Sequence, residues 1–146
     1  MVLGSMKNQI DIPVEWGDSD PATIVFYPNF FKWFDIGTWR LFEAAGLSYD
    51  VLTSEYGLCG MPLVEATAKF SSPIRYGDTV RLTSHISVWS RKTFEVTHRA
   101  EVGGQLRARG SETRVLARQP AGPGTIEAVM PPERIVAALP VHEPPG

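Results

Sequence analysis

Two carboxylates in a short polar segment are the first residues of this sequence that could do chemistry. Asp18 and Asp20 lie within Gly-Asp-Ser-Asp-Pro, residues 17–21, just before a long aromatic segment. One interpretation is turn formation alone, because Asp side chains in such clusters hydrogen-bond nearby backbone N–H groups. If one carboxylate points into a cavity near a helix N-terminus, it can attack an activated carbonyl or act as general base on a water. Backbone N–H groups there would stabilise the developing oxyanion.

A third carboxylate, Asp35, lies inside the aromatic segment, between Phe34 and Ile36. A buried aspartate needs a hydrogen-bond partner. Two interpretations stay open at this point. Asp35 could pair with Arg40 or lie on a polar stripe with Lys32 as part of the structure, or it could accept a hydrogen bond from a ligand hydroxyl at the floor of a cavity.

Cations gather in the middle of the chain. Residues 61–119 hold ten Lys and Arg against five Asp and Glu, whereas residues 1–60 hold three against eight. The adjacent Arg91 and Lys92 fall between two predicted strands, where a basic pair can hold a phosphate. A solvated turn on a basic sheet face is the alternative.

Other catalytic patterns are absent. The three histidines, His85, His98 and His142, have no metal-ligand spacing, so we expect no metal site. His98 lies on an apolar strand face, which predicts a hydrogen-bonded core histidine. Glu65 is expected to be a solvated strand residue, with a second acid–base role as the alternative. The lone Cys59 is expected to be a small core residue. The chain has no nucleophile elbow, P-loop or dinucleotide fingerprint.

A helix and a set of strands must position these residues. Pro28 suits the first position of a helix and Gly46 the position after its end, so a long helix is predicted over residues 30–45. Its aromatic residues spread around more than one face, which is typical of a helix wrapped by the rest of the fold. A shorter helix or structured loop is expected over residues 47–56, and a short helix over 131–139.

The strands are predicted from alternation of apolar and polar residues. Residues 10–14 form a first strand, at an edge because Pro13 cannot donate to a ladder. From Pro62 the period is again two, and Gly103-Gly104 is a hairpin signal. The expected strands are 62–70, 80–88, 94–102 and 106–117. Joined by short connections, they predict an antiparallel meander that residues 120–124 end. One helix cannot cover both faces of such a sheet.

The composition is that of one ordinary domain, with 146 residues, 43% apolar and 21% charged. A disordered tail, a collagen-like fibre and a coiled coil are excluded. No apolar run reaches membrane-helix length, and no signal peptide opens the chain. The single cysteine, Cys59, cannot form an internal disulfide, so we expect a cytoplasmic protein. We expect residues 1–7 to be a disordered N-terminus or a cloning remnant, 8–140 a single domain, and 141–146 a frayed tail.

Residues 16–35, WGDSDPATIVFYPNFFKWFD, resemble the signature of the 4-hydroxybenzoyl-CoA thioesterase family of hotdog-fold acyl-CoA thioesterases. A second match is VWSRKTF, residues 88–94. The resemblance covers roughly residues 8–119 and agrees with the order of strand, helix and strands. It implies an α+β hotdog fold, with a long central helix wrapped by a five-stranded antiparallel sheet. It also implies homodimers that assemble into homotetramers, with active sites at the dimer interface.

The resemblance assigns roles to particular residues. It implies that Asp20 is catalytic, as nucleophile or general base, and that the backbone amide of Tyr27 polarises the thioester carbonyl. Asp35 would bind a ring hydroxyl of the acyl group, while Arg91 and Lys92 would contact CoA phosphates. Ser90 stands where the close relative has another basic residue, which implies a weaker phosphate clamp.

The expected function is hydrolysis of an aromatic acyl-CoA of hydroxybenzoyl type to the free acid and CoA. Pro28 follows Tyr27, as in the hydroxybenzoyl branch of the family. No cofactor, nucleic acid or membrane is expected to take part, and CoA is part of the substrate. The alternatives are aliphatic, phenylacetyl or acyl-carrier-protein thioesters and, from another class, a non-catalytic acyl-CoA binder. The presence of Asp20 argues against the binder.

Overall fold

The computed structural model describes residues 6–142 of the chain. The expectations for residues 1–5 and 143–146 lie outside these residues. The helices are α1 (Pro28–Ala44), α2 (Tyr49–Tyr56) and α3 (Glu133–Ala138), with a single 3-10 turn η1 (Trp16–Asp18). The strands are β1 (Lys7–Pro13), β2 (Leu63–Phe70), β3 (Thr79–Trp89), β4 (Phe94–Val102), β5 (Gln105–Arg114), β6 (Leu116–Arg118) and β7 (Glu127–Val129).

The five long strands form one antiparallel sheet in the order β1-β3-β4-β5-β2. The prediction of a four-stranded meander was wrong for its first strand, since β2 pairs with β5 and only β3, β4 and β5 follow one another. The connection from β2 to β3, residues 71–78, carries the chain across the sheet end to the far side. Eight residues with Pro73 among them are a crossing segment rather than a tight hairpin. The edge position predicted for the first strand is confirmed.

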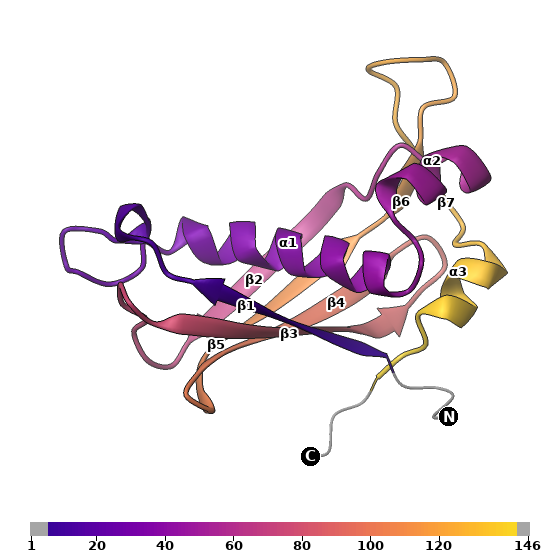
Figure 1. Cartoon of the computed structure of the whole chain (residues 1–146). Helices are drawn as coiled ribbons and strands as arrows, with labels where there is room; N and C mark the ends of the chain where they lie inside the picture. The colour runs from indigo at the N-terminus through magenta and orange to yellow at the C-terminus, as the bar shows by residue number, and fades with distance from the viewer. Residues whose placement is uncertain (1–5, 143–146) are drawn as a thin grey trace.

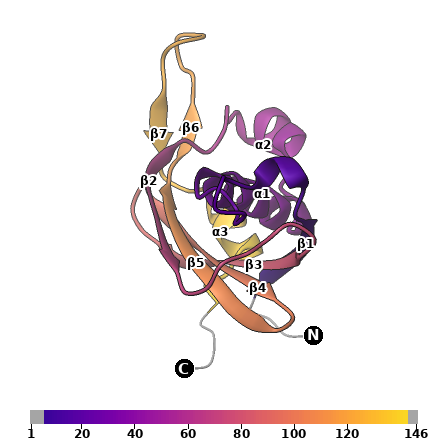
Figure 2. The ribbon, with the colours of Figure 1, turned by 90° about the vertical axis from the view of Figure 1, so that its left-hand side faces the viewer.

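The sheet curls around α1, which lies along its concave face (Figures 1 and 2). Pro28 occupies the first turn of the helix, and Gly46 adopts a left-handed φ of 79° just after its end. The predicted long, wrapped helix is thereby confirmed. Within the described residues, none of the helices has the length and apolar character needed to cross a bilayer.

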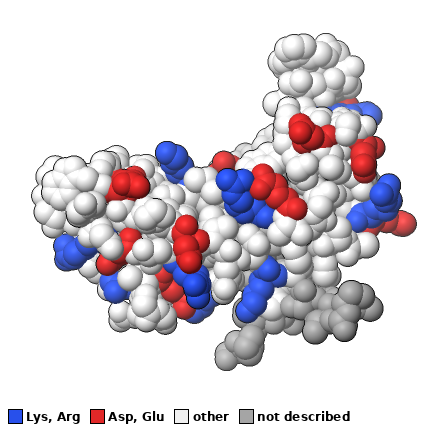
Figure 3. All heavy atoms as spheres, viewed as in Figure 1, with Lys and Arg blue, Asp and Glu red and all other residues white. Residues whose placement is uncertain are grey.

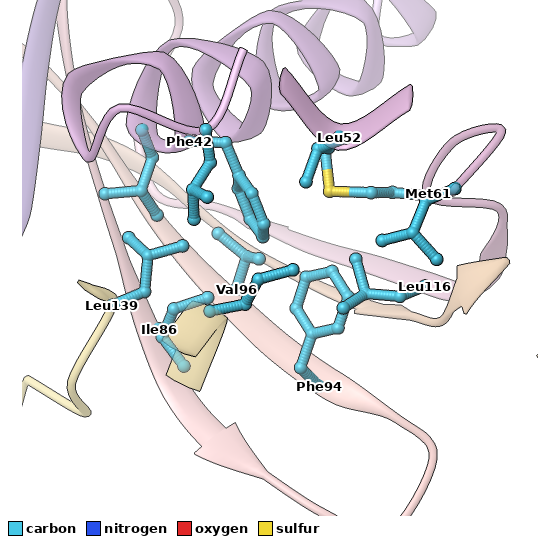
Figure 4. Close-up of a cluster of buried hydrophobic side chains, with 12 residues drawn as sticks. Phe42, Leu52, Met61, Ile86, Phe94, Val96, Leu116 and Leu139 are labelled. Carbon is cyan, nitrogen blue, oxygen red and sulfur yellow. The ribbon is translucent and has the colours of Figure 1, made fainter. Parts of the chain in front are cut away.

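Two apolar clusters fill the space between α1 and the sheet. One surrounds the C-terminal half of the helix, where Phe42 packs with Leu52 of α2, Phe94 of β4 and Leu139 after α3 (Figure 4). The other surrounds the N-terminal half and centres on Phe34. Burial of apolar area at about 25 cal/mol per Å² makes these clusters the main source of stability.

The end of the sheet differs from the expectation. The predicted strand 106–117 is divided, because Val115 turns its N–H to Pro62 O (3.1 Å) and the chain leaves β5. The residues that follow form β6, which pairs with β7 in a separate two-stranded ladder. Residues 120–124 therefore do not end the sheet but form the loop of a protruding hairpin (Figure 1).

Two glycines let α1 approach the sheet closely. A Cβ at Gly37 would lie 2.6 Å from Ser84 Oγ, and a Cβ at Gly110 would lie 2.2 Å from the Phe34 ring. Both separations are far below van der Waals contact. The helix therefore depends on these positions for its depth in the sheet.

We expect Gly110→Ala to lower the free energy of unfolding by about 1–3 kcal/mol, because the added methyl overpacks a filled core. Urea denaturation measures the change. Gly17→Ala is the matched control, since nothing lies within 4 Å of a Cβ there. An unchanged urea midpoint for Gly110→Ala would contradict the packing described.

Candidate active site

A cleft of about 690 Å³ opens at the N-terminal end of α1. Two segments far apart in sequence form it, namely residues 20–30 and the end of β2 with the connection that follows. Its lining residues are Asp20, Ile24, Val25, Tyr27, Phe30, Phe70, Ser71, Ser72, Pro73, Ile74 and Arg75. The structure thus brings together two of the predicted site residues, Asp20 and Tyr27.

The carboxylate of Asp20 is half-buried and only partly engaged. Its Oδ1 accepts the N–H of Ala22 at 2.8 Å, and its backbone O accepts the N–H of Thr23 at 2.9 Å. Thr23 has a φ of 65°, which is uncommon for a non-glycine residue and marks a tight loop. The turn interpretation is therefore correct in part. Oδ2 makes no hydrogen bond with any described residue and stays available to a ligand in the cleft.

Tyr27 sits at the N-cap of α1, where the first backbone N–H groups of a helix have no partner within it. Asn29 N–H bonds Phe26 O, and Phe30 N–H bonds Tyr27 O. The Tyr27 N–H donates to no group among the described residues. It is therefore a free donor at the positive end of the helix dipole.

The geometry of the cleft can support acyl chemistry. It supplies a carboxylate with one free oxygen and a backbone N–H able to bind an oxyanion. Apolar walls from Phe30 and Phe70, whose rings lie 4.9 Å apart, can hold an acyl group. No group of three or more His, Cys, Asp or Glu side chains within residues 6–142 is placed to hold a metal ion.

Asp35 does not line this cleft. The proposed pairing with Arg40 is wrong, because Arg40 bonds Glu43 at 2.9 Å. Asp35 Oδ1 instead accepts Arg114 Nη2 at 2.8 Å, across from α1 to β5. In the single chain its side chain is 53% exposed, so the expectation of a carboxylate stripped of water is not met by one subunit.

The Asp35 partner belongs to a buried polar network. Arg114 also donates to Glu112 Oε2 at 2.6 Å and to Met61 O at 2.8 Å. Its side chain is only 5% exposed. One guanidinium thus ties α1, β5 and the segment before β2 together, which fixes the Asp35 carboxylate on the helix surface.

The network continues under the helix through His98. Its Nε2 donates to Glu112 Oε1 at 2.9 Å, and Thr38 Oγ1 donates to the same oxygen. Nδ1 is then unprotonated and accepts Ser84 Oγ at 2.7 Å. The ring of Phe34 stacks on the imidazole at 4.9 Å. The prediction that His98 is a hydrogen-bonded core histidine is confirmed.

Burial and pairing set the protonation of this network. Burial raises the pKa of Glu112, but hydrogen bonds from His98 and Arg114 outweigh it and lower the pKa to about 2. Burial lowers the pKa of His98 more than Glu112 raises it, so the ring is neutral. Glu112 is therefore a buried carboxylate whose charge is balanced by Arg114.

Ser84, His98 and Glu112 share the residue types of a hydrolase triad, yet they cannot act as one. The three residues are between 0% and 2% exposed, and none of them lines the cleft. A nucleophile must reach its substrate. This group serves the packing of the helix, and Asp20 in the cleft remains the candidate catalytic residue.

The structure places Arg91 and Lys92 away from the cleft. They occupy the exposed turn between β3 and β4, beside Phe94, which contacts Phe42 near the C-terminal end of α1. Asp20 and Tyr27 lie at the other end of a 17-residue helix, which is about 25 Å long. Glu65 lies exposed on β2, outside the cleft, and Cys59 is half-buried.

Sequence reasoning missed part of the site. It did not place residues 70–75 in the cleft, because their position depends on the pairing of β2 with β5. It also missed Glu112 and Arg114. The sequence did contain a sign of their role. Glu112 and Arg114 fall on the same inward face of the strand as Gly110, and charges on such a face must be paired.

Comparison with known proteins decides the family. A model of the thioesterase-like superfamily matches residues 14–139. The chain belongs to this superfamily. It is a thioester hydrolase with the hotdog fold, as the sequence motifs implied.

Individual relatives of this chain support the same family assignment. The 4-hydroxybenzoyl-CoA thioesterase of Pseudomonas sp. (strain CBS-3) is 36% identical over 110 residues, or 71% of this chain and 78% of that enzyme. The structure of 4-hydroxybenzoyl-CoA thioesterase from that strain superimposes with a TM-score of 0.83, at 29% identity over 92% of this chain and 99% of that one. A gentisyl-coenzyme A thioesterase matches with a TM-score of 0.76, at 30% identity over 90% and 98% of the two chains.

The network predicts how acid affects the thioesterase. The pKa of Glu112 is about 2 in the folded protein and 4.5 ordinarily, so the folded state binds fewer protons in this range. Its contribution to stability is complete above pH 4.5 and declines as the pH falls toward 2. We expect urea midpoints to fall between pH 5 and pH 3.

Glu112→Gln is the variant that isolates this effect. It is less stable than the wild type at pH 7, because Arg114 loses its buried counter-charge. Its urea midpoint changes less between pH 5 and pH 3, because the titrating group is gone. Equal slopes for the two proteins over that range would assign the acid sensitivity to other groups.

Proposed function

We propose that this thioesterase hydrolyses an aromatic acyl-CoA of hydroxybenzoyl type to the free acid and CoA. The observation that carries the proposal is the pairing of Asp20 with the free Tyr27 N–H in one cleft. Two relatives also support it, since their names give 4-hydroxybenzoyl-CoA and gentisyl-coenzyme A as substrates, both hydroxylated aromatic acyl groups.

Asp20 acts on the thioester carbonyl in one of two ways. As a nucleophile it forms a mixed anhydride and expels the CoA thiolate, and water then hydrolyses the anhydride. As a general base it removes a proton from the attacking water instead. In both routes the negative charge that develops on the carbonyl oxygen is stabilised by the Tyr27 N–H at the start of α1.

Asp35 is proposed to accept the ring hydroxyl of the acyl group. Arg114 holds its Oδ1 in one place, and Oδ2 makes no hydrogen bond with any described residue. In one chain this carboxylate lies outside the Asp20 cleft and is half-exposed. A second subunit is therefore needed to enclose it with an acyl group.

We propose that the enzyme is a homodimer assembled into a homotetramer. The apolar residues Leu63, Val64 and Phe70 of the edge strand β2 are 51–61% exposed, which favours coverage by another chain. Arg91 and Lys92 would then contact the CoA phosphates of a substrate held in another chain's cleft. The cleft of their own chain is too far away, because it lies at the opposite end of α1. A cytoplasmic location, suited to the unpaired Cys59, and the lack of a separate cofactor complete the proposal.

Asp20→Asn tests the catalytic role. Asparagine keeps the shape of the side chain but removes its nucleophilicity and basicity, so kcat on 4-hydroxybenzoyl-CoA should fall at least ~100-fold. The matched control is Asp18→Asn in the same loop, whose amide oxygen can still accept the Glu15 N–H. We expect that control to retain most activity. Turnover by Asp20→Asn at a near wild-type rate would exclude the mechanism.

The acyl specificity is tested by comparing 4-hydroxybenzoyl-CoA with benzoyl-CoA. Only the hydroxylated ring can donate to Asp35, and stranding a buried acceptor costs ~1–3 kcal/mol. The wild type should therefore prefer the hydroxylated substrate by roughly 10- to 100-fold in kcat/KM.

Asp35→Ala should shrink this preference, and Asp11→Ala, which removes another exposed aspartate in an arginine ion pair, should leave it unchanged. A wild-type preference near one would point to an aliphatic or phenylacetyl substrate and would leave the role of Asp20 intact.

A further inference from the structure

Three cations form a row on the sheet face that points away from α1. Lys69 of β2 pairs directly with Arg109 of β5, which pairs directly with Arg99 of β4. The same cross-strand row continues through Thr83 to Gln9. Neighbouring strands lie about 4.8 Å apart, so the three cations span about 10 Å.

The orientation of the row follows from its neighbours. Ala68 packs against the apolar cluster around Phe34, and Gly110 lies against the Phe34 ring. His98 is fully buried under the helix. Since side chains alternate along a strand, the residues that follow Ala68 and His98 and precede Gly110 point outward.

The row has little counter-charge. Lys69 and Arg109 are exposed and make no ion pair with any described residue, and Arg99 has only a 3.7 Å contact with Glu101. Like charges directly opposite each other destabilise a sheet. Elsewhere, on the face drawn in Figure 3, Lys and Arg alternate with Asp and Glu. The uncompensated row thus accounts for part of the basic excess of residues 61–119.

The row begins next to the end of β2 that borders the cleft, on the opposite face of the sheet. Lys69 comes just before Phe70 and Ser71, which line the cleft. A fourth cation, Arg107, donates to Pro73 O at 2.7 Å and so rests against the loop that forms the cleft wall. Arg75 of the same loop lines the cleft itself. Arg75 and Arg107 thus lie between the cleft and the three cations on the outer face.

We propose that the row Lys69–Arg109–Arg99 binds the phosphate groups of the CoA whose thioester lies at Asp20 of the same chain. The inference rests on the proposed function, because it takes an acyl-CoA as the substrate. It adds a phosphate site to the one expected from Arg91 and Lys92, which lie at the other end of α1.

The test is the double variant Lys69→Ala/Arg109→Ala. Binding remote from the reacting bond contributes equally to the ground state and the transition state, so we expect KM for acyl-CoA to rise about 10-fold with kcat unchanged. KM for the matching acyl-pantetheine, which has no phosphate, should not change. The variant should be at least as stable as the wild type in thermal unfolding, because a like-charge contact is removed.

The matched control, Arg118→Ala/Arg134→Ala, removes two cations from β6 and α3 and should leave both KM values unchanged. A rise in KM for acyl-CoA only in Arg91→Ala/Lys92→Ala, and not in Lys69→Ala/Arg109→Ala, would overturn the row and leave the proposed function standing. So would an equal rise for acyl-CoA and acyl-pantetheine.

Binding of adenosine 3′,5′-bisphosphate, the phosphate-bearing end of CoA, distinguishes failure of the proposed function from failure of the proposed phosphate site. If the wild type hydrolyses no acyl-CoA, the proposed function fails, but titration with this nucleotide still tests the row. Tighter binding to the wild type than to Lys69→Ala/Arg109→Ala supports the site, and equal binding overturns it.

Discussion

The charge of Glu112 constrains much of the interior of this protein. A carboxylate under a helix must be fully hydrogen-bonded, and here Arg114, His98 and Thr38 supply the donors. The helix can reach these donors only because Gly37 and Gly110 have no side chains. The same arginine extends to Asp35, so a buried ion pair fixes a carboxylate on the surface of α1. Packing of the core and placement of a candidate substrate contact thus share one guanidinium.

The sequence predicted the elements better than their pairing. Alternation identifies a strand and its faces but not its neighbour, so β2 was expected beside β3 when it pairs with β5. Helix boundaries were predicted well because Pro28 and Gly46 act locally. The partner of Asp35 could not be found this way, since Arg114 lies 79 residues away and many arginines compete for an exposed aspartate.

In the candidate site, too, the sequence predicted local features better than contacts between distant segments. Asp20 and Tyr27 lie in a contiguous motif, and the fold brings them into one cleft. Arg91 and Lys92 belong to a separate motif, and the fold carries them to the other end of α1. Short-range geometry is thus encoded in the loop and the helix start, whereas the complete substrate site depends on how strands, and in our proposal subunits, are placed side by side.

The position of β2 also bears on how the molecule folds and fluctuates. Its contacts join residues 38 to 51 positions apart, from Phe70–Ala108 to Leu63–Arg114, whereas the β3–β4 hairpin closes over a few residues. The entropy lost in closing these loops makes β2 costly to add to the local unit of β3, β4 and β5, as is β1, whose pairs with β3 join residues 66 to 78 positions apart. In the single chain β2, like β1, is an edge strand with one neighbour, so its backbone amides exchange with solvent more readily than those of the central strands. Because Phe70 and the loop after it form one wall of the cleft, opening of this edge changes the shape of the space next to Asp20.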